Sequence, residues 1–240
     1  MAAGAVLALL FGILTQFLLS NQVATGLALT LFGLGLAALL GHSYTGLKPP
    51  ATAKLDIAFL SDIPVLGRIL FNHDAVVYFS IIMVFAIWWF LNRSRAGLVL
   101  RSVGESPESA HALGYPVRRI RFVAIVAGGV LCGLAGGYIS IVYTPLWVEG
   151  MVAGRGWIAL ALTVFATWRP VRLLLGAYLF GGVTMLQLQL QGMGVDVPAP
   201  IMSMLPYLAT VVVLVLISRN PGWIRRNMPA SMGKPFHPGA

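Results

Sequence analysis

The sequence predicts an all-α fold, a polytopic integral membrane bundle of about six to seven membrane segments that include one short helix or half-helix. Of the 240 residues, 58% are hydrophobic and 10% are charged, and the mean hydropathy is +0.87. A soluble domain carries roughly 25% charged residues, so this chain has too few polar side chains to cover a surface in water. Its apolar residues also form runs long enough to cross a bilayer core of about 30 Å as helices.

Each apolar run predicts one helix. The longer runs are residues 2–19, 23–40, 75–91, 122–141, 173–190 and 200–217, and residues 156–167 form a shorter run. Only Ser20, Asn21 and Gln22 separate the first two runs, which predicts a tight helical hairpin. Residues 42–74 hold three prolines and nearly balanced charges, so we expect a loop with short surface-lying pieces. In residues 122–141, Gly129, Gly133 and Gly137 recur every four residues and predict close packing against a neighbouring helix.

The longest polar break, residues 92–121, carries six arginines and two glutamates. Ser106 suits the N-cap of a helix, Pro107 its first position, and Gly114 a left-handed C-terminal position. Glu108 complements the positive first turn of such a helix. The break is therefore expected to be an arginine-rich loop that contains about two turns of helix. Two turns are not stable alone in water, so this helix needs a surface to lie against.

Basic residues concentrate in alternate connections between the runs. The polar break, the turn at residues 168–172 and the segment after residue 217 carry twelve basic and two acidic residues, whereas all other segments carry four and five. By the positive-inside rule, these three regions face the cytoplasm. The net charge of +9 is then a signal of topology, and we expect no nucleic-acid partner. Residues 1–218 are predicted to form one transmembrane domain, and residues 219–240 a cytoplasmic tail that is mobile at its end.

Catalytic and metal-binding motifs are missing from the sequence. It has no GxxxxGK[ST] loop, no HExxH and no CxxC, and Cys132 is its single cysteine. Near the middle of the predicted spans there is no Asp, Glu, Lys, Arg or His, whereas ion-coupled transporters usually place such a residue there. We therefore expect no enzyme activity and no cofactor or metal, and we expect a partner to supply the energy for any transport.

Polar residues at membrane depth allow two interpretations. Thr184, Gln187 and Gln191 share one helix face, which could line a path for a neutral polar solute or form interhelical hydrogen bonds. Arg155 and Trp157 begin the short segment, where the backbone N–H groups and Arg155 could contact solute or form a gate. The alternative for these two residues is a tight turn whose arginine snorkels to the interface.

Three segments of the sequence resemble one family of transport proteins. GESPESA at residues 104–110, followed by LGY at 113–115, resembles the cytoplasmic loop of ABC-importer permeases for branched-chain amino acids, ribose-type sugars and nucleosides. GMVAGRGWIALALTVFATWRPVRLLLGAYLFGG at residues 150–182 and MSMLPYL at 202–208 are most similar to nucleoside and simple-sugar permeases. Those permeases are served by basic-membrane-protein-type lipoprotein receptors. The sequence lacks the upstream spans of that family, so we expect it to be part of a longer permease.

The resemblance implies a permease subunit in the plasma membrane of a prokaryote. Its partners would be cytosolic ATP-binding subunits, a second permease subunit (identical or different) and an extracytoplasmic solute-binding lipoprotein. The short helix would be the coupling helix that sits in a groove of the ATPase, formed by Glu105, Ser106, Pro107, Glu108, Ala110, Leu113 and Gly114. A surface-bound loop helix without a partner is the alternative.

The expected function is ATP-driven import of a small polar solute, either a nucleoside or a simple sugar. Branched-chain amino acids are the alternative solutes within the same family. A stand-alone secondary transporter or channel is the alternative of another class. A membrane enzyme or assembly factor fits less well, because no catalytic constellation is present.

Overall fold

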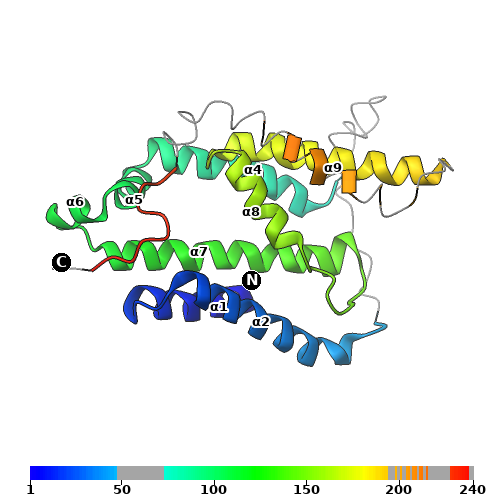
Figure 1. Ribbon diagram of the computed structural model, residues 1–240, viewed down its shortest axis with the longest axis horizontal. Helices are drawn as coiled ribbons and strands as arrows, with labels where there is room; N and C mark the ends of the chain where they lie inside the picture. The colour runs from blue at the N-terminus through cyan, green and yellow to red at the C-terminus, as the bar shows by residue number, and fades with distance from the viewer. Residues whose placement is uncertain are drawn as a thin grey trace. The chain divides into compact units, whose positions relative to one another are not determined.

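The computed structural model describes residues 1–47, 73–193, 198, 201, 204–205, 207–209, 211–212, 215 and 228–237. Across these ranges the regular elements are helices, and the one β-type pairing is an isolated bridge between Thr45 and Trp147. The prediction of an all-α fold is confirmed. The α-helices labelled in Figure 1 are α1 (Ala2–Gly12), α2 (Gln22–Gly41), α4 (Ala75–Arg93), α5 (Arg95–Glu105), α6 (Pro107–Ala112), α7 (Val117–Tyr138), α8 (Arg155–Phe165) and α9 (Pro170–Gly192).

Four of the described helices are long and apolar enough to cross a membrane. They are Gln22–Tyr44, Ala75–Arg93, Val117–Tyr143 and Pro170–Gly192, where the first and third include short turns, η2 (His42–Tyr44) and η3 (Ile139–Tyr143). Shorter apolar helices span Ala2–Phe17, which includes the π turn η1 (Ile13–Phe17), and Arg155–Phe165. The first run is thus shorter than expected, while the short helix at α8 is confirmed. Most of the predicted loop at 42–74, and much of the run at 200–217, lies outside the described residues.

The described chain divides into two compact units. The first contains Met1–Ser80, Arg93–Ala153 and Ala230–Ala240, and the second contains Ile81–Asn92 and Gly154–Pro229. Helices α1, α2, α5, α6 and α7 therefore belong to the first unit, and α8 and α9 to the second. Each unit has contacts of its own that determine how its helices pack.

In the first unit, α1 packs along α7 (Figure 1). A methyl group at Gly4 would overlap the carbonyl oxygen of Gly129, so the two backbones approach too closely for any side chain there. Further along, the rings of Phe17 and Phe122 meet edge to face with their centroids 5.5 Å apart. Small residues thus permit close helix contact, which favours association in lipid. The connection to α2 is short, as expected, and Asn21 caps α2 by accepting from the N–H groups of Val23 and Ala24.

The polar break at residues 92–121 is almost entirely helical, which corrects the prediction of a loop. Ser94 caps α5, with its Oγ accepting from the Gly97 N–H at 2.9 Å, and α7 already begins at Val117. Arginine is itself a good helix former. The basic residues therefore mark the change from apolar to polar sequence, and the helices continue through it. The structure confirms a short helix, α6, within this region.

The last described segment, residues 228–237, was expected to have a mobile end. That expectation is wrong for Ser231 to Phe236. Ser231 is 8% exposed and Phe236 is 5% exposed, and both belong to the first unit. In Figure 1 the red segment runs beside α5 and the start of α7. A buried aromatic side chain holds the segment in place despite its lack of secondary structure.

In the second unit, α8 and α9 form a hairpin around a tight turn. Thr167 and Trp168 both have positive φ, at 49° and 56°, and Thr167 is fully buried. Its Oγ1 accepts a hydrogen bond of 2.8 Å from Arg172 Nη1. Gly176 lies against the Phe165 ring, where an added methyl group would come within 2.6 Å. The arginine of this turn therefore stabilises the turn itself.

Candidate functional site

Helix α6 has well-formed caps at both ends. Ser106 Oγ accepts from the Ser109 N–H at 3.3 Å, and Pro107 occupies the first turn. At the other end, Gly114 has φ +86°. The Gly114 N–H donates to the His111 carbonyl at 2.8 Å, and the Tyr115 N–H to the Ala110 carbonyl at 3.1 Å. This pair of bonds is a Schellman motif, which allows the chain to reverse into α7 after only six helical residues.

The residues expected in the coupling helix divide into two groups. Pro107 and Ala110 are buried, with Ala110 only 2% exposed. Glu105, Glu108, Leu113 and Gly114 are exposed, and Ser106 is half-buried. Leu113 is 77% exposed. The inner side of α6 therefore attaches it to this chain, while the outer side is available to a partner.

The inner side of α6 covers a small apolar core. Val103 from α5, Ala110 from α6, Val117 from α7 and Phe236 are each 5% exposed or less. Ile120 packs against this group. Hereafter "the α5–α6 module" means α5, α6, residues 117–121 of α7 and residues 230–237. Its core provides the surface that a two-turn helix requires.

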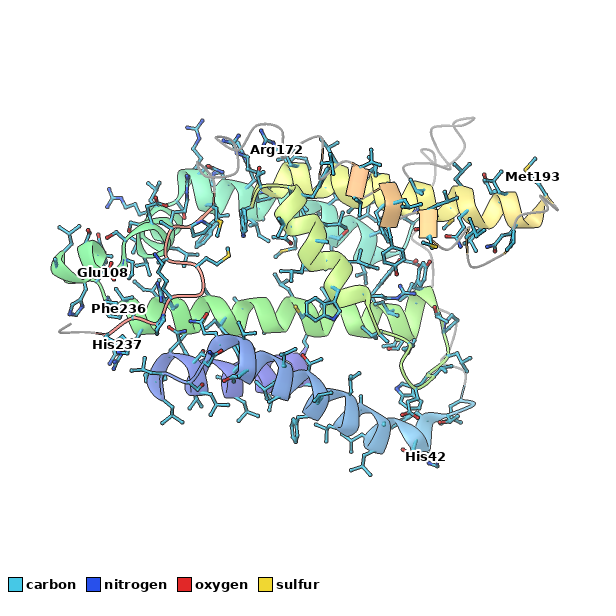
Figure 2. All side chains as sticks on the ribbon, viewed as in Figure 1. His42, Glu108, Arg172, Met193, Phe236 and His237 are labelled. Carbon is cyan, nitrogen blue, oxygen red and sulfur yellow. The ribbon has the colours of Figure 1, made fainter. Side chains whose placement is uncertain are left out.

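The contribution of the C-terminal segment was missed by the sequence prediction. Phe236 lies in the module core, and Arg121 hydrogen-bonds to Ser231 and Lys234. Figure 2 labels Phe236 at the end of the segment, close to α6 and the start of α7. The available signal was a single phenylalanine in an otherwise non-periodic polar segment. Nothing local in the sequence identified its partners, which lie more than 100 residues earlier.

The residues of the proposed solute path all lie in the second unit. Arg155 is the first residue of α8, and Trp157 is 66% exposed. On α9, Thr184 and Gln187 are half-buried and Gln191 is exposed. Thr184 Oγ1 donates to the Phe180 carbonyl at 2.9 Å, which satisfies this hydroxyl within its own helix. A close contact between α8 and α9 lies at Gly176, which faces the Phe165 and Leu162 side chains.

The three glycines of α7 differ in their surroundings. A methyl group at Gly129 would overlap the Ala8 side chain, and one at Gly133 would come within 3.0 Å of the Met1 carbonyl oxygen. At Gly137 it would meet nothing within 4 Å. Two of the three glycines thus lie in the contact with α1. Gly137 continues the same spacing beyond that contact.

The chemistry that these sites can perform is binding and mechanical contact. In the part of the chain that the structure describes, no three His, Cys, Asp or Glu side chains come together as a metal site would require. Cys132 is free and exposed. The exposed outer side of α6 is the feature best suited to contact with another protein.

Comparison with known proteins agrees with a transport role. Residues 1–217 match the family model described as the permease component of branched-chain amino acid transport systems. A putative glucose ABC transporter permease protein of Haloferax volcanii is 39% identical over an alignment 254 residues long. The alignment covers 96% of this chain and 77% of the relative. A guanosine ABC transporter permease protein of Bacillus subtilis is 32% identical over an alignment 248 residues long. This alignment covers 98% of this chain and 75% of the relative.

A third relative matches a smaller part. The nucleoside ABC transporter permease protein of Lactococcus lactis subsp. cremoris is 34% identical over 165 residues, covering 67% of this chain and 52% of the relative. No solved structure matches this chain. The similarity to these three relatives therefore rests on sequence, and the arrangement of α5, α6 and the C-terminal segment is described from this chain alone.

Proposed function

We propose that this chain carries a nucleoside or a simple sugar into the cell. The chain belongs to the permease family of branched-chain amino acid transport systems, and the proposal starts from that membership. The chain is a permease subunit of an ABC importer, a multi-pass membrane protein of a prokaryote and not itself an enzyme. The observation that supports this solute class is the similarity, over 96% and 98% of the chain, to a glucose permease and a guanosine permease.

The energy and the solute reach a permease of this kind from partner proteins. An ATP-binding subunit and a solute-binding protein are its partners as a member of the family. We further propose a second permease chain, identical or different, and a solute-binding protein anchored as a lipoprotein. The basic residues of the polar break and of the C-terminal segment support a cytoplasmic position for both.

The outer side of α6 is proposed to be the surface that the ATP-binding subunit contacts. Leu113 is exposed at the end of the helix, and Glu108 is exposed in its first turn. The caps and the module core fix the position of α6 through its buried side. Its exposed side is therefore available to a partner protein. A short, rigid helix on an independent core can receive force from a partner and transmit it to α7.

The test of this contact uses Leu113→Asp. A new charge on the exposed outer side should abolish co-purification of the ATP-binding subunit while the permease remains folded. Leu98→Asp is the matched control, since Leu98 is an exposed leucine of α5, and Leu113→Met should retain binding. Ala110 is unsuitable for this purpose because it is buried. Equal binding by Leu113→Asp and the unsubstituted chain would contradict the assignment.

The test of solute class uses proteoliposomes that contain the full transporter with its solute-binding protein. ATP-dependent uptake of labelled guanosine or glucose is expected, with excess leucine failing to compete. Competition by leucine would favour the branched-chain amino acid alternative. Uptake driven by an ion gradient in the absence of the ATP-binding subunit would instead establish a secondary transporter.

The polar face of α9 is proposed to line the solute path. Gln187 and Gln191 offer amide groups that can donate to and accept from hydroxyl groups of a sugar or nucleoside. Thr184 is the weaker candidate because its hydroxyl donates to its own helix. Arg155 and Trp157 are proposed to contact the solute at the start of α8.

A further inference from the structure

The C-terminal segment is attached to the α5–α6 module by a continuous set of hydrogen bonds. The N–H and the Oγ of Ser231 both donate to the Gly104 carbonyl of α5. Arg121 Nη2 donates to Ser231 Oγ at 2.9 Å, and Arg121 Nη1 donates to the Lys234 carbonyl at 3.0 Å. Charge-assisted hydrogen bonds of this length are among the stronger ones in proteins. One arginine on α7 thereby holds two points of the segment, and the segment in turn holds the end of α5.

The segment also supplies a side chain to the core beneath α6. Phe236 is 5% exposed and belongs to the core with Val103, Ala110 and Val117. Its ring meets the His111 ring edge to face, with centroids 5.4 Å apart. His111 lies in the last turn of α6. Phe236 therefore lies against the buried side of α6 and contacts its C-terminal turn, close in sequence to the exposed Leu113.

These contacts determine the orientation of α6 because the helix has few other means of support. It contains six residues, and its caps fix its ends but not its angle to α5 and α7. Ala110 is small, so most of the volume beneath it must come from other side chains. Arg121 joins the start of α7 to the C-terminal segment through its two hydrogen bonds.

We propose that residues 230–237 position the coupling helix, so that efficient coupling of ATP hydrolysis to transport requires this segment as well as α6. Phe236 and Ser231 are positioning residues: they act through α6 and do not contact solute or ATP. The inference rests on the proposed function of α6. It adds that the surface contacted by the ATP-binding subunit is set by two regions of the chain separated by more than 100 residues.

The experiment compares Phe236→Ala with Met232→Ala in the complete reconstituted transporter. Met232 is the matched control because it lies in the same segment and is 44% exposed. The ATP hydrolysed per solute imported should rise by roughly tenfold in Phe236→Ala and remain unchanged in Met232→Ala. Phe236→Leu, which keeps an apolar side chain, should recover most of the coupling. Ser231→Ala removes hydrogen bonds of the segment but keeps the Phe236 ring. If Phe236→Ala does not assemble, the ATP hydrolysed per solute imported is measured in Ser231→Ala instead, and it should rise.

Hydrogen exchange on the same permease chain gives a second, independent measurement. Protection of the α6 amides should fall by about a hundredfold in Phe236→Ala. Faster exchange with unchanged coupling would overturn the inference, because the segment would then only stabilise the module. Unchanged exchange would overturn it by showing that the contact is absent. If the unsubstituted transporter neither binds the ATP-binding subunit nor imports solute, it is the proposed function of α6 that fails, and this inference fails with it.

Discussion

The α5–α6 module and the membrane-length helices differ in how far their apolar side chains are buried. In the module, four apolar residues from α5, α6, α7 and the C-terminal segment are each 5% exposed or less. Helix α4 buries no residue, and α2 buries none along its apolar window. The module is thus packed like a small soluble domain. The four described membrane-length helices bury almost none of the residues along their apolar windows inside this chain.

This difference teaches which parts of the molecule are stabilised by the chain itself. The module is stabilised by apolar side chains that it buries among its own elements. Helices α1 and α7 associate through close backbone contact between small residues, at Gly4 and Gly129. Substitutions in each of the two regions test whether they respond separately.

The largest effect is expected from Val103→Asp. Val103 is 1% exposed in the module core, and a buried unpaired carboxylate costs roughly 3–5 kcal/mol. Hydrogen exchange should show α5 and α6 opening while α1 and the membrane part of α7 keep their protection. Leu98→Asp, at an exposed position of α5, is the control and should leave exchange unchanged. A uniform loss of protection across α1 and α7 would show that the module and the membrane helices form one cooperative structure.

A somewhat smaller effect is expected from Gly129→Leu on the membrane side. Any side chain at Gly129 overlaps Ala8, and overpacking of this kind costs about 1–3 kcal/mol. The midpoint of thermal unfolding in detergent should fall, and α1 should lose protection while α6 retains it. Gly137→Leu is the matched change on the same helix, where open space surrounds the Cα, and its midpoint should stay near that of the unsubstituted chain. Equal losses in the two variants would contradict the described α1–α7 contact.

Ser106→Ala should have a moderate effect confined to α6. Loss of an N-cap costs about 1 kcal/mol, which is large for a six-residue helix. Amide exchange in α6 is expected to quicken by roughly fivefold, with little change in α5. Ser102→Ala is the control, because the Ser102 hydroxyl donates only to the Val99 carbonyl of its own helix. If both serine variants exchange alike, the cap does not stabilise α6.

The smallest effect is expected from Gln187→Leu on α9. Loss of one neutral hydrogen bond to solute, about 1 kcal/mol, should raise the KM of uptake by roughly fivefold without changing the unfolding midpoint. Thr184→Val should leave the KM unchanged because the threonine hydroxyl donates to Phe180. An unchanged KM in Gln187→Leu, with a lowered unfolding midpoint, would indicate that this side chain packs between helices.

Most of the helices could be predicted because each has a long apolar run. The caps of α6 were also readable from Ser106, Pro107 and Gly114, since local hydrogen bonding explains all three. Helix α5 was missed because its arginines resemble a polar loop, although Gly97, Leu100, Val103 and Gly104 recur at helical spacing.

The candidate site was only partly predictable. The sequence located α6 but did not distinguish the buried Ala110 from the exposed Leu113, because a six-residue helix has no measurable periodicity. The role of Phe236 depends on contacts across more than 100 residues. Such contacts leave no local pattern, so they required the structure. Gly129, Gly133 and Gly137 also differ in the residues that they face, which equal spacing does not reveal.

The bond between Ser231 and Gly104 joins residues 127 positions apart, and this separation has a consequence for biosynthesis. At about 5–20 residues per second, a ribosome takes roughly 6–25 s to proceed from one to the other. During that interval α8 and α9 are made, while Val103, Ala110 and Val117 remain uncovered. A nascent chain that stalls in this interval leaves these three apolar side chains uncovered by Phe236, and chaperones and proteases can recognise such a patch. Closure of the module therefore marks a chain whose synthesis has passed α8 and α9.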